Sequence, residues 1–356
     1  MSRRAYAEAQ RGLGRRVAAV FPARYPPELL WARGVVPVEV WDPPAPTGEA
    51  DAHLPPMVCA VARRGLGLLL GSQPVDLLLF PHTCDSLQNL ATLLRDLLGE
   101  RRPCLSFYPP KGPEGPSARA FLLEEIRGLS QRLDAAVGEP SPGRLREAVR
   151  WARERDEALR DLYEARARGE LAASAEAFYG TVRRTEYLWP EEAVAELRAF
   201  RRERAGKRPA GVPLVLSGVL PVPKDLLRHL DARGLWVAED DFLGLGRRFP
   251  REAPPLSEDP LEAAAERLLA LPPCPTQGAS VAARLAFLEG LARRASARAV
   301  VFLAFKFCEP ELFDIPFLAA GLEERGLRCL VLETGGVDET PASLLTRLEA
   351  FVESLP

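Results

Sequence analysis

Residues 299–333 read AVVFLAFKFCEPELFDIPFLAAGLEERGLRCLVLE. The two ends of this stretch, 299–304 and 329–333, are continuous apolar runs of the kind that forms buried parallel strands. A helix is predicted between them, at about residues 313–325. A strand, a helix and a second strand in this order form a right-handed crossover in a parallel sheet. The stretch therefore predicts an α/β fold.

The same alternation continues on both sides of this stretch. Strand-like runs are found upstream at 213–218 and 235–240, and a final helix is predicted at 343–354. The first third of the chain has two further buried-strand runs, at 35–40 and 75–80. We therefore expect two doubly wound parallel-sheet domains of the Rossmann or flavodoxin type. In such folds, ligands bind at the carboxyl ends of the strands.

A helical connector is predicted between the two domains. Ser141 and Pro142 suit the cap and first turn of a helix, and near-helical apolar spacing continues toward Arg204. The charge-rich segment 201–211 marks the end of this connector. We expect an N-terminal α/β domain at 1–140, the helical connector at 141–205 and a C-terminal α/β domain at 206–356.

Length and charge exclude several classes of protein. The chain has 356 residues, and at about 150 residues per domain this length favours two domains. With 47 basic and 49 acidic residues, the net charge is −2, so we expect neither a nucleic acid nor an anionic membrane as partner. No apolar run approaches the roughly 20 residues of a membrane-spanning helix. The basic N-terminus lacks the apolar block of a signal peptide, which favours a cytoplasmic location.

Common nucleotide and hydrolase motifs are missing from the sequence. There is no GxxxxGK[ST] loop, so the chain does not bind ATP in that way. The glycine pairs at 65–71 and 244–249 do not form GxGxxG in a strand–turn–helix context, which disfavours a dinucleotide site. No GxSxG motif is present, which disfavours a serine hydrolase.

Three of the six cysteines are candidate metal ligands. Cys59, Cys84 and Cys308 each precede or open a predicted helix. Backbone amides at a helix start stabilise thiolates, and the thiolate is the form that binds metals. Three thiolates that converge can hold an iron–sulfur cluster with one iron left open. The alternative is that each is a buried thiol, since none lies in a CxxC motif.

The remaining cysteines and the histidines do not suggest a site of their own. Cys104 and Cys329 lie in apolar strand-like runs, and Cys274 lies in a proline-rich loop. The dispersion of all six cysteines argues against a disulfide framework. Only three histidines are present and there is no HExxH motif, so a histidine-based zinc site is not expected.

Several segments, in order along the chain, resemble the 2-hydroxyacyl-CoA dehydratase / benzoyl-CoA reductase family. The similarity begins near residue 17 and reaches the C-terminus, and it is most specific at Lys-Phe-Cys (306–308) and at Thr-Arg-Leu-Glu-Ala-Phe (346–351). The segments that carry it include CAVARRGLG (59–67), HTCDSLQNL (82–90), the stretch from 305 to 335, and LLTRLEAFVESL (344–355).

This resemblance implies a fold and a cofactor. Each subunit of the family has two α/β domains, and three cysteines bind a 4Fe–4S or related cluster. Carried over to this chain, the ligands are Cys59, Cys84 and Cys308, whereas the other three cysteines have no place in the motif. This chain departs from the family's pattern at Ala60, because the family commonly has serine after the first cysteine. That departure leaves the local hydrogen bonding and the choice of substrate open.

Three charged residues are further candidates, each with a plainer alternative. Glu28 matches a glutamate near the family's active site, where it would relay a proton or hold the substrate hydroxyl; alternatively, it is a first-turn glutamate favoured by the helix dipole. Lys306 lies two residues before Cys308 and would offset cluster charge, or it is a solvated lysine. Asp85 is open to interpretation as a simple helix-start carboxylate.

The resemblance also implies a reaction and partners. One electron passes from a reduced cluster to a 2-hydroxyacyl-CoA, the resulting ketyl radical loses the 2-hydroxyl group, and an enoyl-CoA is formed. A separate ATP-hydrolysing activator protein supplies the electron, in agreement with the missing phosphate-binding loop. The chain is expected to form a homodimer or to pair with a paralogous second subunit. Alternatives are a benzoyl-CoA reductase-like subunit, a homodimeric reductase with a double-cubane cluster, a cluster-bearing subunit without catalysis, and an α/β binding protein whose cysteines are empty.

Overall fold

Two parallel sheets organise the chain, as the sequence predicts. The computed structural model describes residues 1–22, 24–43, 47–71, 73–99, 102–112, 115–208, 210–221, 223, 225–335 and 340–355. The first unit comprises Met1–Glu157, Arg184–Val194 and Pro250–Leu271, and the second comprises Ala158–Arg183, Ala195–Phe249 and Pro272–Pro356. Each unit takes in part of the segment 141–205, and the expected boundaries after residues 140 and 205 stay predictions.

The sheet of the first unit has the strand order β2-β1-β3-β4, with all strands parallel. The chain leaves β1 on one side to form β2 and then returns to the other side for β3, so the carboxyl ends of β1 and β3 form a topological switch point. The residues of β1 after Arg16 and all residues of β3 are buried, as expected for the inner strands of a parallel sheet. The strands are β1 (Arg16–Val20), β2 (Val35–Glu39), β3 (Leu77–Pro81) and β4 (Cys104–Phe107).

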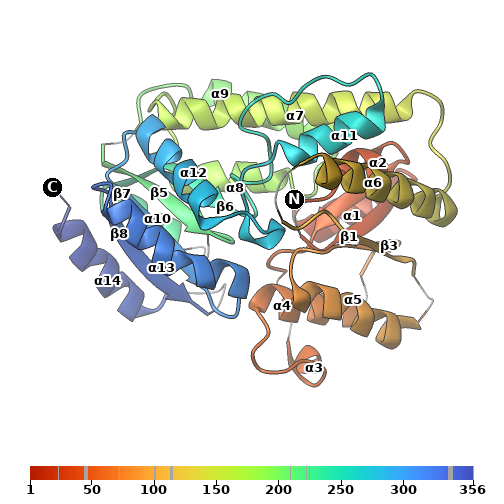
Figure 1. Ribbon diagram of the computed structural model, residues 1–356, viewed down its shortest axis with the longest axis horizontal. Coiled ribbons are helices and arrows are strands. Elements are labelled where there is room, and N and C mark those ends of the chain that lie inside the picture. The colour runs from red at the N-terminus through yellow and green to blue at the C-terminus, as the bar shows by residue number, and fades with distance from the viewer. Residues whose placement is uncertain are drawn as a thin grey trace. The chain divides into compact units, whose positions relative to one another are not determined.

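Helices cover this sheet on both faces (Figure 1). Leu79 and Phe107 pack into a core with Ile126 of α6 and Leu268 of α11. Gly34 lies between α2 and β2 with a φ of 69°, in the left-handed region that favours glycine. The helices of this unit are α1 (Arg3–Gly12), α2 (Pro27–Trp31), α3 (Gly48–Asp51), α4 (Ala60–Leu70), α5 (Asp85–Leu98), α6 (Pro116–Val137) and α11 (Pro260–Leu269). Three helices contain residues of both units: α7 (Arg144–Ala167), α8 (Ala175–Arg184), of which only Arg184 belongs to the first unit, and α9 (Pro190–Glu203).

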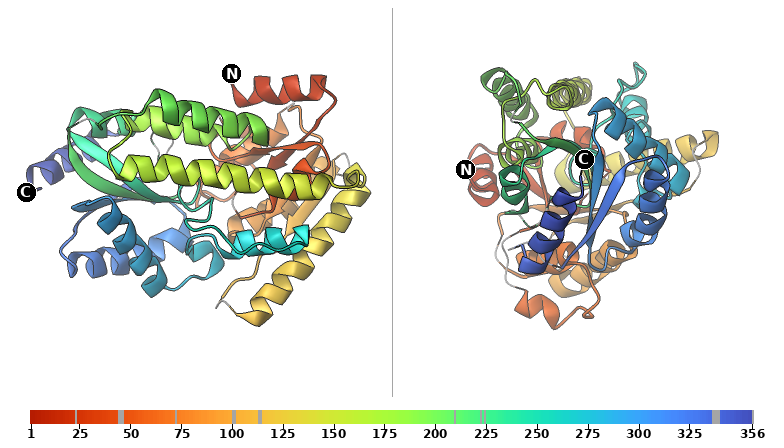
Figure 2. Two further views of the ribbon diagram at one scale, coloured as in Figure 1. Left: turned by 90° about the horizontal axis from the view of Figure 1, so that it is seen from above. Right: turned by 90° about the vertical axis from the view of Figure 1, so that its left-hand side faces the viewer.

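The sheet of the second unit repeats this topology, with the order β6-β5-β7-β8 and all strands parallel. Successive side chains alternate between two cores, because side chains along a strand point to opposite faces. Val301 lies in one core with Leu348 of α14, whereas Val300 lies in the other core with Leu318 of α13. Figure 2 shows α14 and α13 on opposite sides of this sheet. The strands are β5 (Val212–Gly218), β6 (Leu235–Phe242), β7 (Ala299–Phe305) and β8 (Arg328–Thr334).

The helices of the second unit agree with the predicted alternation, with one shift. The helix predicted from Phe313 begins at Glu309, because Pro310 is accommodated in its first turn. In the described part of the chain, no helix is long and apolar enough to cross a membrane. The helical segments are α8 (Ala175–Arg184), α10 (Leu226–Ala232), the 3-10 turn η2 (Pro275–Gln277), α12 (Val281–Arg294), α13 (Glu309–Glu323) and α14 (Ala342–Glu353).

Candidate functional site

Each of the three candidate cysteines stands directly before the first turn of a helix. Cys59 precedes α4, Cys84 precedes α5 and Cys308 precedes α13. Cys84 follows β3 and Cys308 follows β7, so these two occupy corresponding places after the third strand of each sheet. Unpaired backbone N–H groups at a helix start favour a negative charge at such a place. The sequence prediction that these cysteines open helices is confirmed.

Cys59 and Cys84 are neighbours in the first unit, where α4 and α5 pack against each other (Figure 1). Burial raises the pKa of the Cys59 thiol, although the amides of Val61 and Ala62 oppose this shift. Burial, together with a smaller effect of a charge on Cys59, likewise raises the pKa of the Cys84 thiol to about 11. Both thiols are therefore protonated at neutral pH, and a metal would have to displace their protons to bind.

Cys308 belongs to the second unit and follows a strained residue. Phe307 has a φ of 64°, in the left-handed region, which is costly for a bulky side chain. The Cys308 amide donates to the Phe305 carbonyl at 3.0 Å, and its own carbonyl accepts from Glu311 and Leu312 at 3.1 and 3.0 Å. These bonds hold the backbone of Cys308 between the end of β7 and the first turn of α13.

An unpartnered hydroxyl lies next to Cys84. Thr83 is only 2% exposed, and its Oγ1 atom has no hydrogen-bond partner among the described residues. A buried hydroxyl without a partner is costly, which marks a place where a further acceptor can bind. Sulfur is such an acceptor, and hydrogen bonds to sulfur are common around iron–sulfur clusters. Two neighbouring thiols at helix starts, with this donor beside them, fit part of a cluster site.

Glu28 combines features of both interpretations of this residue. It lies in the first turn of α2, but it is only 1% exposed. Burial raises the pKa of its carboxyl group, although Arg267 and Arg155 act in the opposite direction. Its Oε2 atom has no hydrogen-bond partner among the described residues. A buried, protonated carboxyl group is able to donate a proton to a bound molecule.

The charged residues that surround Glu28 could not be predicted from the sequence. Arg267 Nε lies 3.6 Å from Glu28 Oε1, and it donates to Asp156 Oδ2 at 2.6 Å. Asp156 also accepts from Arg155 Nη2 at 3.1 Å. These residues come from helices far apart along the chain, and only the apolar surroundings of Arg267 in α11 hint that its charge is buried.

Lys306 and Asp85 match their plainer interpretations. Lys306 forms an ion pair with Glu333 at 3.1 Å, and both side chains are at least half exposed. The Asp85 side chain is 90% exposed and lies 3.9 Å from His82 Nε2. Neither residue has the burial expected of a group that acts on a bound substrate.

Cys274 occupies an environment that the sequence does not reveal. It is 1% exposed, and its Sγ atom accepts from Arg247 Nη1 at 3.3 Å and lies 3.0 Å from Thr276 Oγ1. The acidic residues at the end of the otherwise apolar β6 run LWVAEDDF are the one sequence feature that could have indicated buried charge here. No group of three histidine, cysteine or carboxylate side chains that could hold a metal ion is found among the described residues.

Comparisons with known proteins match nearly the whole chain. The model of the family described as "2-hydroxyglutaryl-CoA dehydratase, D-component" matches residues 22–355. Lactoyl-CoA dehydratase subunit beta of Anaerotignum propionicum is 23% identical, over 96% of this chain and 92% of that protein. (R)-phenyllactyl-CoA dehydratase beta subunit of Clostridium sporogenes is 22% identical, with the same shares covered. A benzoyl-CoA reductase subunit of Thauera aromatica is 23% identical, over 86% of this chain and 82% of that protein.

Proposed function

Since the chain belongs to the 2-hydroxyglutaryl-CoA dehydratase, D-component family, we propose that it is the iron–sulfur subunit of a 2-hydroxyacyl-CoA dehydratase. The family comprises dehydratase subunits, and two of the relatives are beta subunits of dehydratases whose names specify CoA thioesters of 2-hydroxy acids. The proposed reaction is the radical elimination of water from a 2-hydroxyacyl-CoA to give an enoyl-CoA.

Cys59, Cys84 and Cys308 are the proposed ligands of a 4Fe–4S cluster. The observation that carries this assignment is that all three stand directly before a helix, with two of them adjacent and beside the unpartnered Thr83 hydroxyl. Three ligands leave one iron open for a substrate oxygen. When bound, the cluster would donate one electron to the 2-hydroxyacyl-CoA and recover it after water has left, so that an enoyl-CoA is formed.

Glu28 is the proposed proton donor. Because burial raises the pKa of this carboxyl group, it keeps its proton to a higher pH than an ordinary glutamate, and a departing hydroxyl group requires a proton. Its unpartnered Oε2 atom is the one available to a bound molecule. Arg267 would then stabilise the carboxylate that remains, because its guanidinium lies 3.6 Å from Oε1.

The proposed partners are a separate ATP-hydrolysing activator protein and a second subunit. Each of these relatives is named as one subunit of an enzyme, and two of them as beta subunits, which supports a paralogous second subunit over a homodimer. The missing GxxxxGK[ST] loop supports a separate activator, because the chain lacks this means of coupling ATP hydrolysis to electron transfer. We place the enzyme in the cytoplasm, where ATP is available to the activator.

A second candidate function is a low-potential reductase. The benzoyl-CoA reductase subunit of Thauera aromatica is as similar in percentage identity as the dehydratase subunits, which supports a benzoyl-CoA reductase-like subunit. A homodimeric reductase that carries a double-cubane cluster in place of a 4Fe–4S cluster is a separate alternative. The two functions differ in the product formed from the CoA thioester. A dehydratase releases water from a 2-hydroxyacyl-CoA, whereas a benzoyl-CoA reductase adds electrons to an aromatic ring.

Iron and acid-labile sulfide per chain, measured on protein purified without oxygen, test the cofactor. We expect about four irons per chain in the unmodified protein, with iron lost in Cys59→Ala, Cys84→Ala and Cys308→Ala. Cys104→Ala is the matched control and should keep its iron. A clearly higher iron count would favour the double-cubane alternative, and a protein that stays iron-free after reconstitution would overturn the proposal. Activator-coupled assays with a 2-hydroxyacyl-CoA and with benzoyl-CoA then separate the two reactions.

A further inference from the structure

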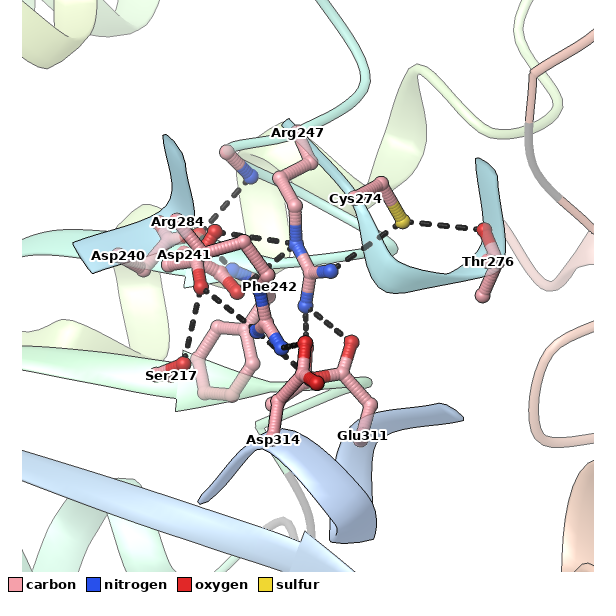
Figure 3. Close-up of polar contacts among 12 residues, drawn as sticks. Ser217, Asp240, Asp241, Phe242, Arg247, Cys274, Thr276, Arg284, Glu311 and Asp314 are labelled. Atoms are coloured by element: carbon pink, nitrogen blue, oxygen red, sulfur yellow. Dashed lines mark hydrogen bonds and ion pairs between the residues drawn. The ribbon is translucent and has the colours of Figure 1, made fainter. Parts of the chain in front are cut away.

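A cluster of buried charges lies where β5, β6 and α13 meet in the second unit (Figure 3). Arg247, Arg284, Asp241 and Glu311 are each at most 1% exposed. Charged side chains are almost never buried to this degree unless they are paired. We refer to these four residues as the Arg247 cluster.

The Arg247 guanidinium donates hydrogen bonds to several parts of the second unit. Its Nη2 atom donates to the Gly218 carbonyl at the end of β5 at 2.6 Å and to Glu311 Oε1 on α13 at 2.5 Å. Its Nε atom donates to the Asp241 carbonyl at 3.1 Å, and its Nη1 atom donates to the Cys274 sulfur at 3.3 Å. A planar guanidinium with five donors suits such a site, whereas a lysine ammonium does not.

Arg284 completes the pairing from α12. Its Nη2 atom donates to Glu311 Oε2 at 2.9 Å and to Asp241 Oδ2 at 3.4 Å. Each oxygen of the Glu311 carboxylate is therefore held by a different arginine. Although burial opposes ionisation, Arg247 and Arg284 together lower the pKa of Glu311.

Glu311 connects the Arg247 cluster to Cys308. It lies in the first turn of α13, three residues after the cysteine, and its amide donates to the Cys308 carbonyl at 3.1 Å. The carboxylate of Glu311 cannot move without breaking charged hydrogen bonds in a buried environment. The first turn of α13 is thus fixed to the carboxyl ends of β5 and β6, and the backbone of Cys308 is fixed with it.

We infer that Arg247 and Glu311 are positioning residues that hold the Cys308 thiolate where a cluster iron requires it. This inference rests on the proposed function, because it takes Cys308 as a cluster ligand. Residues that orient metal ligands are worth about 10–100-fold in metal affinity when they are changed. The strained backbone at Phe307 needs such support, since a left-handed φ persists only where surrounding contacts enforce it.

The test compares Arg247→Lys and Glu311→Gln with the unmodified chain, each as the complete protein loaded with iron. We expect iron release to a chelator to become about 10–100-fold faster and the electron paramagnetic resonance spectrum of the reduced protein to change. Glu311→Gln is nearly isosteric, so it keeps the inference testable if Arg247→Lys does not fold.

Two control variants separate positioning from general weakening. Asp314→Asn changes another partner of Arg284, at 2.9 Å, whose side chain is 17% exposed; its spectrum and iron release should match the unmodified protein. Arg166→Met removes hydrogen bonds to Val237 and Ala173, which lie in the same unit but outside α13. It should therefore lower the free energy of unfolding without changing the spectrum.

The outcomes distinguish this inference from the proposed function. If the unmodified chain binds iron and Glu311→Gln has an unchanged spectrum and release rate, the positioning role is overturned while the proposed function stands. The same conclusion follows if Arg166→Met changes both readouts as strongly as Glu311→Gln does. If the unmodified chain binds no iron, the proposed function fails and the inference fails with it.

Discussion

Arg267 is shared unequally between two buried carboxyl groups, because its Nε atom lies 3.6 Å from Glu28 Oε1 but only 2.6 Å from Asp156 Oδ2. The pKa of Asp156 is lowered even though burial opposes this, because Arg267 and Arg155 both act on it. The pKa of Glu28 is raised, because for this residue burial outweighs the attraction of the same arginine. The same arginine therefore lies between one acid whose pKa is lowered and another whose pKa is raised.

Glu28→Gln should change the pH dependence of stability only above the usual carboxyl pKa of 4.5. The folded-state pKa of Glu28 lies above its usual 4.5, so the stability it contributes is complete below pH 4.5 and is lost as the pH rises through the folded pKa. Glutamine cannot ionise, so the free energy of unfolding of Glu28→Gln should fall less over that range. Denaturant unfolding at a series of pH values measures this.

Asp156→Asn is the matched variant for this prediction. The pKa of Asp156 is depressed from its usual 3.8, so its contribution is present above pH 3.8 and is lost as the pH falls through the folded pKa. In Asp156→Asn, the free energy of unfolding should therefore change less as the pH falls. The protein should also be destabilised by about 3–5 kcal/mol, because Arg267 and Arg155 lose their shared partner. If stability changes with pH above 4.5 to the same extent in Glu28→Gln and in the unmodified chain, the pKa of Glu28 is not raised in the folded protein.

Thr83→Val should raise the stability of the iron-free protein and change the reduction potential of the protein that holds the cluster. Without a cluster, the Thr83 hydroxyl is buried and unpartnered, so its removal should stabilise the chain by about 1–2 kcal/mol. With the cluster bound, the hydroxyl is expected to donate to a sulfur atom, so its loss should shift the reduction potential. Unfolding of the iron-free protein and a redox titration of the loaded protein measure the two effects, and Thr83→Ser should behave as the unmodified chain in the titration. An unchanged potential would show that Thr83 makes no bond to the cluster.

Gly218→Ala should destabilise the second unit. Gly218 ends β5 with a φ of 145°, and a Cβ atom there would lie 2.6 Å from the Leu303 carbonyl oxygen of β7. The strands would have to separate, at a cost of about 1–3 kcal/mol in the free energy of unfolding. Gly180→Ala is the control, because a Cβ atom at this position in α8 meets nothing within 4 Å. It should stabilise the helix by about 0.5–1 kcal/mol, and thermal unfolding of both variants tests the contrast.

Arg166→Met should lower stability without affecting the iron content. Arg166 is completely buried, and burial lowers the pKa of its guanidinium to about 10. It donates to the carbonyls of Val237 and Ala173 at 2.6 and 3.3 Å, and it stacks over the Trp236 ring at 4.1 Å. Methionine keeps the apolar contact but leaves the carbonyls unpaired, at a cost of about 1–3 kcal/mol. Denaturant unfolding that showed no loss would mean that the buried arginine contributes no net stability.

The strands and the cysteines at helix starts were accessible to sequence analysis for a physical reason. The apolar runs at 213–218, 299–304 and 329–333 correspond to β5, β7 and β8. The reason is clearest for β7, which is buried throughout, because a strand covered on both faces is apolar along its whole length. Cys84 was recognised as opening a helix because an amphipathic pattern begins directly after it. Both signals are local, since they depend on residues that are neighbours along the chain.

The boundary of α13 shows where local signals fail. A helix was predicted from Phe313, but the structure begins it at Glu309, so that Glu311 enters the first turn and faces Arg247. The residues Glu309 and Pro310 are compatible with a loop as well as with a first turn. The ion pairs of Glu311 stabilise the helical conformation here, and they are tertiary contacts.

The amino-acid sequence by itself therefore specified the two parallel sheets, the three cysteines before helices and the family that these segments resemble. Tertiary structure alone established the buried charge pairs, Arg267 with Asp156 across 111 residues and Arg247 with Glu311 across 64. Helical and strand periodicity arises between neighbouring residues, so it can be read along the chain. The pairing of a buried charge depends on which distant side chain the completed fold brings within hydrogen-bond distance, and no local pattern contains that information.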